Sequence, residues 1–155
     1  MRPVLLPSLF SVMQRNQRAG MPTVNIYEIA NTYSLDKDRR VCEERTLGIV
    51  MFGAIRRKNW ADSERQVTFY DLKGALEALL KEIGIEDFSF VAATKPLFVQ
   101  GLSQEIQAGG DTVGMLGEVN GDHLRLWDLK PPVFGGQISL AKLVPLLSVH
   151  KKFQE

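Results

Sequence analysis

Hydrophobic residues recur at intervals of three and four positions near the start of the chain, with polar residues between them. This spacing places the apolar side chains on one side of a helix, so it predicts a helix over residues 7–19. Gly20 and then Pro22 follow this segment, and both residue types commonly end helices. The chain is therefore expected to begin with a short amphipathic helix.

The next two segments have the patterns of strands. Residues 23–34 alternate between apolar and polar side chains, which predicts a strand with room for one irregularity. Residues 46–52 form a nearly continuous apolar run, which predicts a strand buried on both faces. Because a polar turn at residues 36–40 separates them, we expect the two strands to form a hairpin.

The most regular helical stripe follows residue 68. Its apolar members are Phe69, Leu72, Leu76, Leu79, Leu80 and Ile83. Thr68 and Asp71 have the spacing of a capping box, and Gly84 is placed to end the helix. Gly74 interrupts the stripe at a cost of about 1 kcal/mol relative to alanine. We therefore expect another backbone or side chain to pack closely against Gly74.

The second half of the chain predicts more strands than helices. Extended segments are expected at residues 88–93, 102–108, 112–119 and 133–140. Gly109 and Gly110 favour a tight hairpin between the second and third of them. Asn120 is placed to cap a short helix that runs to Asp128, and residues 141–147 predict a last short helix. The sum is an α+β fold, a mostly antiparallel sheet flanked by helices.

Composition and charge restrict the classes of function. The 155 residues are 45% hydrophobic and 24% charged, as in a soluble globular protein, and we expect one domain over residues 1–155. A net charge of +1 argues against a purely electrostatic binder of nucleic acid or membrane. The single Cys42 fits a reducing compartment. The apolar start is too short for a membrane anchor and does not match a signal peptide, so we expect a cytoplasmic protein.

Few residues have the spacing that catalysis or metal binding requires. His123 and His150 are far apart and neither has a second ligand nearby, so no metal site is expected. Cys42 has acidic neighbours that would disfavour a reactive thiolate. The glycines at 114, 117, 135 and 136 fit no phosphate-binding loop. We interpret them as strand positions that another element approaches closely.

One basic cluster could contact RNA. Arg56, Arg57 and Lys58 precede Trp60 in the most polar stretch of the chain, residues 56–66, which predicts an exposed loop. Such residues can hold a phosphate backbone while the indole stacks on a base. A solvated loop tethered by Trp60 explains the same residues, and both interpretations stay open. With so few cations, any affinity for tRNA should be weak.

Four segments, in order, resemble the bacterial phenylalanyl-tRNA synthetase beta chain. Residues 67–85 resemble a stretch that begins like "DFFDLKG", and residues 1–20 are similar to its "LRTSLLPGLL" segment. Residues 25–33 and 112–134 are similar to two further stretches of that family. Ala30 stands where the family commonly has glycine, and other departures occur near residues 98–101 and 120–121. The resemblance therefore indicates a divergent member.

The resemblance implies one module of a large chain. It is the catalytic-like module, which has a class II aminoacyl-tRNA synthetase-like fold. The class II dimerisation segment would precede it, and the ferredoxin-like anticodon-binding domain would follow it. The implied partners are the synthetase alpha chain and the rest of the beta chain, with tRNA in the full complex. No cofactor is expected on this module, because ATP and Mg²⁺ would bind the alpha chain.

The residues that activate an amino acid in class II synthetases are not matched. The family motif is an aromatic residue, arginine, any residue and glutamate, and residues 33–36 align with it. Ser34 takes the place of the arginine, which would neutralise the α-phosphate in the transition state. We therefore expect no catalytic residues and a structural or assembly module. The alternatives are an independent enzyme and a free-standing module that binds tRNA or a small metabolite.

Overall fold

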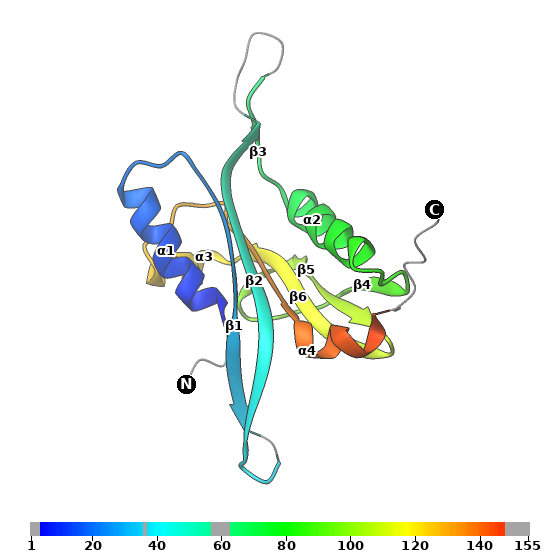
Figure 1. Cartoon of the computed structure of the whole chain (residues 1–155). Coiled ribbons are helices and arrows are strands. Elements are labelled where there is room, and N and C mark those ends of the chain that lie inside the picture. The colour runs from blue at the N-terminus through cyan, green and yellow to red at the C-terminus, as the bar shows by residue number, and fades with distance from the viewer. Residues whose placement is uncertain (1–3, 36, 57–62, 148–155) are drawn as a thin grey trace.

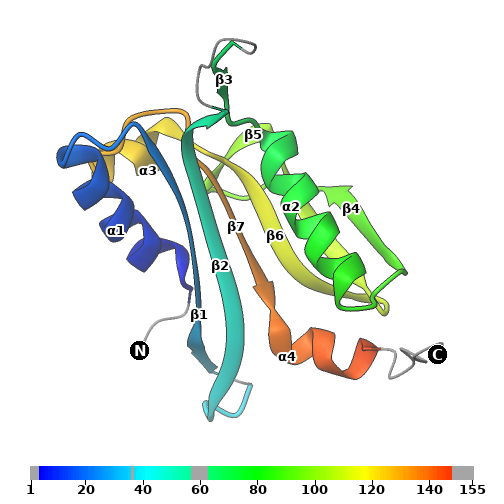
Figure 2. The ribbon, with the colours of Figure 1, turned by 45° about the horizontal axis from the view of Figure 1, so that its top comes forward.

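The computed structural model describes residues 4–35, 37–56 and 63–147, which form one sheet with helices on both faces (Figures 1 and 2). The strands are β1 (Thr23–Leu35), β2 (Val41–Arg56), β3 (Arg65–Gln66), β4 (Phe88–Ala92), β5 (Phe98–Ala108), β6 (Asp111–Val119) and β7 (Phe134–Ser139). The helices are α1 (Leu6–Arg18), α2 (Phe69–Glu82), α3 (Gly121–Leu126), α4 (Leu140–Leu143) and the 3-10 helix η1 (Val144–Leu146). The predicted elements are therefore present, with changes at several ends, and the short strand β3 lies within residues 56–66, where the sequence predicted an exposed loop.

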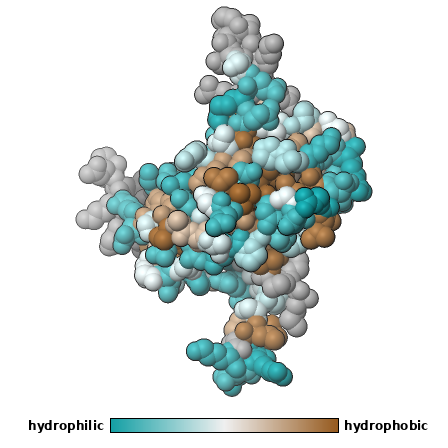
Figure 3. Space-filling model, turned by 180° about the vertical axis from the view of Figure 1, so that it is seen from behind, coloured by the Kyte–Doolittle hydropathy of each residue, from teal (hydrophilic) through white to brown (hydrophobic). Residues whose placement is uncertain are grey.

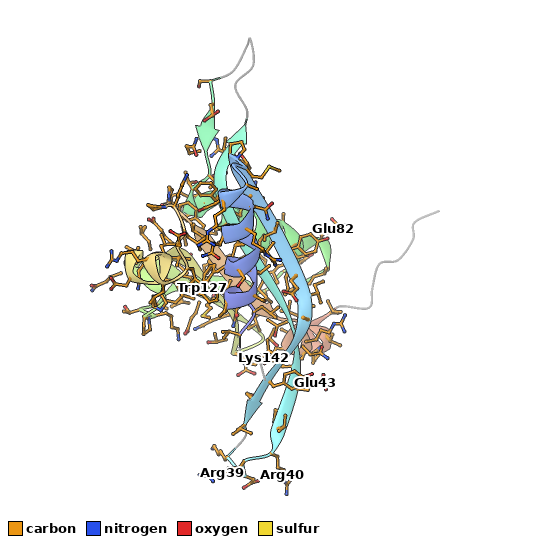
Figure 4. The ribbon with its side chains drawn as sticks, turned by 90° about the vertical axis from the view of Figure 1, so that its left-hand side faces the viewer. Arg39, Arg40, Glu43, Glu82, Trp127 and Lys142 are labelled. Atoms are coloured by element: carbon orange, nitrogen blue, oxygen red, sulfur yellow. The ribbon has the colours of Figure 1, made fainter. Side chains whose placement is uncertain are left out.

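The sheet is antiparallel throughout its described pairings. Its strand order is β1-β2-β7-β6-β5-β4, and β3 pairs with β2 beside this path. The hairpin β1–β2 extends beyond the body of the molecule, with Arg39 and Arg40 at its tip (Figure 4). This observation confirms the α+β class with a mostly antiparallel sheet.

The second strand of the hairpin is longer than predicted. The sequence indicated residues 46–52, whereas β2 runs from Val41 to Arg56. Its polar first residues pair with β1 in continuous register, from Leu35 opposite Val41 to Thr23 opposite Gly53. Main-chain hydrogen bonds hold this pairing, so the strand continues where the apolar pattern has stopped.

The helices α1 and α2 pack on opposite faces of the sheet. A Cβ on Gly135 would lie 3.4 Å from Leu6 of α1, and one on Gly136 would lie 3.4 Å from Leu76 of α2. Successive strand residues face opposite ways, so these neighbours mark the two faces of β7. The close approach expected of the strand glycines is confirmed. Each helix covers its own buried apolar cluster.

A capping box begins α2, as predicted. The Asp71 carboxylate accepts hydrogen bonds from the Thr68 backbone N–H and hydroxyl, each at 2.8 Å. The two terminal nitrogens of the Arg65 guanidinium, Nη1 and Nη2, donate to the same carboxylate at 2.8 Å. The Arg65 hydrogen bond is the largest influence that holds the pKa of Asp71 well below its usual range. The short strand β3 is thereby fixed to the start of α2.

The expectation for Gly74 is wrong. Gly74 is exposed, and among the described residues no atom outside its own stretch of helix backbone lies within 4 Å of the position that its Cβ would occupy. The helical stripe buries Leu72 and Leu76 against the sheet, which turns the position between them toward solvent. Gly74 therefore lowers helix stability without a packing contact in return.

We predict that Gly74→Ala stabilises the chain by about 1 kcal/mol, because alanine has the higher helix propensity and meets no neighbour. Chemical denaturation followed by circular dichroism measures the change. Gly53→Ala is the matched control and should destabilise, because Gly53 has φ +88° and its Cβ would lie 2.1 Å from the Pro22 oxygen. Equal effects of the two substitutions would contradict the description of both sites.

Candidate functional site

A polar pocket lies on the face of the sheet that α1 partly covers. A Cβ on Gly48 would lie 2.9 Å from Leu9 of α1, and Thr46, two residues earlier in β2, faces the same way. The pocket has a volume of about 210 Å³. Its polar and charged lining residues are Thr32, Glu44, Thr46, Lys95, Glu105, Thr112, Gln137, Ser139 and Lys142.

Hydrogen bonds fix the walls of this pocket. Ser139 Oγ donates to the Glu44 carboxylate and accepts from the Lys142 backbone N–H at 3.1 Å. This contact joins the start of α4 to the hairpin. The hydroxyls of Thr32 and Thr46, both buried, lie 2.9 Å apart on neighbouring strands. The hairpin, β7 and α4 therefore form one connected polar surface.

The charges in the pocket balance. Lys95 Nζ lies 2.5 Å from Glu105 Oε1, and this hydrogen bond lowers the pKa of the Glu105 carboxyl. Lys142 Nζ donates to the Thr112 backbone oxygen at 2.8 Å. Glu44 supplies the second carboxylate. With two carboxylates and two ammonium groups, the pocket offers no net positive charge to a polyanion such as a nucleotide triphosphate.

The structure places Ser34 at the tip side of this pocket. Ser34 lies two residues beyond Thr32 in β1, so it belongs to the same face of the sheet, and its side chain is exposed. A serine hydroxyl has neither the charge nor the two-pronged geometry of a guanidinium. Among the described residues that line the pocket, none is an arginine. The described lining residues therefore provide no guanidinium group that could bind the phosphate of a reacting nucleotide.

An apolar groove lies on the opposite face of the hairpin, against α2. It has a volume of about 320 Å³ and is lined by Tyr27, Ile29, Leu47, Ile49, Ala75, Leu76 and Leu79. Tyr27 is 72% exposed and Ile29 is 46% exposed, although both are large hydrophobic residues. Exposed apolar residues that line one groove indicate a contact surface more often than isolated ones do.

The groove borders an edge of the sheet. The strand β1 is at one end of the strand order, and in the part of the chain that the structure describes it pairs with β2 alone. It is 13 residues long. Natural proteins usually cover or shorten such edges, because unpaired main-chain groups invite another strand or chain. Hydrophobic residues also reach the surface on the side turned away from the viewer of Figure 1 (Figure 3).

The sequence contains a sign of the groove in β1. The apolar residues of this strand change phase between Ile26 and Ile29, a pattern that by itself predicts an irregularity in the strand. The pairing with β2 is continuous, so Ile26 faces α1 whereas Tyr27 and Ile29 face the groove. Hydrophobic residues on both faces of an edge strand indicate a second contact surface, and the sequence of β1 contains this pattern.

The predicted RNA contact lies almost wholly outside the described residues. Three of its residues lie outside the described ranges, namely Arg57, Lys58 and Trp60. The fourth, Arg56, is the last residue of β2. The tethering role of Trp60 and the contact with tRNA therefore stay predictions.

The other residues considered from the sequence lie in separate places. Cys42 is exposed and lies opposite Ser34 in the hairpin. The side chain of His123 contacts the Asn120 side chain that caps α3, at 2.9 Å. His150 lies outside the described residues. Within residues 4–35, 37–56 and 63–147, no His, Cys, Asp and Glu side chains group as metal ligands, and no helix could span a membrane.

Comparison with solved structures identifies the fold. The crystal structure of pyrrolysyl-tRNA synthetase from Desulfitobacterium hafniense superposes with a TM-score of 0.70 at 17% identity, covering 93% of this chain and 48% of that one. A second structure of this enzyme from the same organism has the same TM-score at 18% identity. The class II synthetase-like fold predicted from the sequence is therefore confirmed.

Comparison of sequences identifies the family. The chain is 28% identical to the phenylalanine–tRNA ligase beta subunit of Fusobacterium nucleatum over 99% of this chain and 20% of that protein. It is 30% identical to the subunit of Symbiobacterium thermophilum over 93% of this chain and 16% of that protein. The chain thus spans about a fifth of the relatives that it matches. Because the model of the phenylalanyl-tRNA synthetase beta chain CLM domain matches residues 1–140, the chain belongs to that family.

Proposed function

We propose that this chain is a non-catalytic assembly module of a phenylalanyl-tRNA synthetase beta chain. It supports the catalytic alpha chain in charging tRNA with phenylalanine. The observation that carries the proposal is the exposed apolar groove beside the uncovered strand β1, in a chain of this family. The free-standing binding module considered from the sequence is not favoured, because the family model matches nearly the whole chain.

The composition of the polar pocket supports the absence of catalysis. Adenylate formation places growing negative charge on the α-phosphate, and catalysis depends on fixed positive groups aimed at it. Here Ser34 stands at the place of the arginine, while Glu44 and Glu105 add negative charge nearby. We assign ATP and Mg²⁺ to the alpha chain of the complex for this reason.

We predict no phenylalanine-dependent exchange of pyrophosphate into ATP by this chain alone. The missing guanidinium is expected to leave the phosphoryl transition state without its main stabilisation. The measurement uses radiolabelled pyrophosphate, with heat-treated protein as the background and an intact ligase as the positive control. Exchange that exceeds the background and stays with the chain through a second purification would contradict the proposal.

The groove has the properties of a protein interface. Tyr27 and Ile29 are exposed, Leu47 and Leu76 form its floor, and Ala75 leaves room beside α2. Aromatic and aliphatic residues of this kind fill the cores of interfaces, where charged residues are depleted. The free edge of β1 could in addition pair its main-chain groups with a partner. We propose the synthetase alpha chain as the occupant of this surface.

We predict that the double substitution Tyr27→Ser with Ile29→Ser weakens association with the alpha chain by at least about tenfold, or roughly 1.4 kcal/mol. Size-exclusion chromatography with light scattering, over a range of concentrations, measures the complex. The control is Tyr70→Ser with Leu126→Ser, because Tyr70 is 76% and Leu126 is 79% exposed and neither lines the groove.

The control should bind as the original chain does, because it removes similar side chains outside the groove. Equal affinity of the groove variant and the control would assign the interface to another surface. The melting temperature of each variant is measured first, so that a loss of folding is not taken for a loss of binding.

A contact with tRNA at Arg56, Arg57, Lys58 and Trp60 remains part of the proposal for the full complex. Because the net charge is only +1, binding of tRNA would release few counterions and gain little affinity from them. This contact would therefore orient the tRNA and contribute little to its affinity. Cytoplasmic location likewise remains a prediction from the composition.

A further inference from the structure

A row of side chains on one face of β1 has nearly the same pattern in both directions. Alternate residues of a strand face the same side, so this row contains Tyr27, Ile29, Asn31, Tyr33 and Leu35. Asn31 is at its centre, and the residues on either side of it are large and mostly apolar. Leu35 is 61% exposed, and Tyr27 and Ile29 are exposed as well. A symmetric row of this kind is suited to pairing with a second copy of the same strand.

The edge of β1 lacks the features that usually prevent such pairing. Its 13 residues include no lysine, arginine or proline, and Glu28 is its one charged residue. The register with β2 is continuous along the whole strand, so no bulge turns the edge away. Natural sheets protect their edges with charges, prolines, bulges or very short strands. In the described part of the chain, β1 is therefore a long edge that another strand can join.

A two-fold axis through Asn31 gives the antiparallel pairing that matches these side chains. Directly opposite residues of antiparallel strands lie on the same face, and each then meets the residue at the same distance from the axis in the other copy. Tyr27 would meet Leu35 of the second copy, and Ile29 would meet Tyr33. Cross-strand pairs of aromatic and aliphatic side chains stabilise antiparallel strands.

The charged and polar groups agree with this register. Glu28, on the other face of β1, would lie opposite Ser34 of the second copy, so no two like charges face each other. An axis through Glu28 would instead place two carboxylates opposite each other. The Asn31 amide donates to the Glu43 carboxylate. An amide has a second N–H and an oxygen, so the two Asn31 side chains at the axis can hydrogen-bond each other.

The paired segment lies on the side of the hairpin that α1 does not reach. The contact of α1 with Glu28 is made by Ser8, in its first turn, at 3.1 Å. Figure 4 shows the hairpin extending past the start of this helix toward Arg39 and Arg40. The strand residues between Glu28 and the tip are therefore accessible along the edge.

We propose that two copies of this chain associate through antiparallel pairing of β1 about Asn31, which joins their sheets into one. The proposal does not depend on the assembly role, because the partner is the chain itself. The alpha chain would compete with the second copy for Tyr27 and Ile29. Two strands alone make a small interface, so we expect a Kd on the order of 100 µM. At concentrations far below this value, the chain is monomeric and its β1 edge is free.

Disulfide trapping tests the register. Asn31→Cys, with the exposed Cys42 replaced by serine, places two thiols opposite each other at the axis, where the Cα atoms are close enough for a disulfide. Asn25→Cys in the same background is the matched control, because Asn25 is exposed on the same face of β1 but far from the axis. Under a mild oxidant, the covalent dimer should form at least about tenfold faster with Asn31→Cys. Equal rates would overturn the proposal.

Sedimentation equilibrium tests the association itself, without the alpha chain. Between about 5 µM and 1 mM, the mass of the original chain should rise from 17.4 kDa toward twice that value. Ile29→Lys should stay monomeric, because a lysine on an edge strand opposes pairing. Leu126→Lys is the control, since Leu126 is exposed outside β1, and it should associate as the original chain does.

A monomeric mass of the original chain at about 1 mM, or association that Ile29→Lys leaves unchanged, would overturn the proposal. If Ile29→Lys does not fold, the two disulfide rates decide. Both experiments omit the alpha chain, so their failure would leave the assembly role standing, and loss of the assembly role would leave the pairing of two copies standing.

Discussion

Packing of one helix on each face of β7 is the contact on which the rest of the structure depends. Gly135 admits Leu6 of α1 on one face, and Gly136 admits Leu76 of α2 on the other. A Cβ at either position would lie 3.4 Å from these leucines, which is ordinary contact distance, so a side chain longer than a methyl group would meet the helix. The two buried clusters therefore meet at one strand, which holds the helices and the central strands as a unit.

This arrangement leaves the hairpin β1–β2 only partly covered, and both candidate surfaces follow from that. On the face of α1, the helix begins short of the hairpin tip and runs away from it, so the polar residues near Glu44 and Ser139 form an open pocket. On the face of α2, the helix lies over β6 and β7, so Tyr27 and Ile29 remain exposed. A module whose uncovered edge is apolar is suited to assembly, and it needs no catalytic group for that role.

The sequence predicted those features that depend on neighbouring residues. The helical stripe of α2, its capping box and the turn at Gly109 are local patterns, and each is present. The close packing predicted at Gly74 is wrong, because tertiary packing decides which side of a helix meets solvent. The polar pocket could not be predicted, since Glu44, Gln137 and the other lining residues are far apart in the sequence and meet only through the sheet order.

We propose that the uncovered edge of β1 receives the synthetase alpha chain, and hydrogen–deuterium exchange tests this proposal most directly. The account predicts that the outward-facing amides of β1 exchange freely in the isolated chain, because they have no neighbouring strand in the described structure. Addition of the alpha chain should slow their exchange, together with that of the α2 residues that line the groove. Exchange in β1 that stays unchanged while the alpha chain is bound would contradict the account.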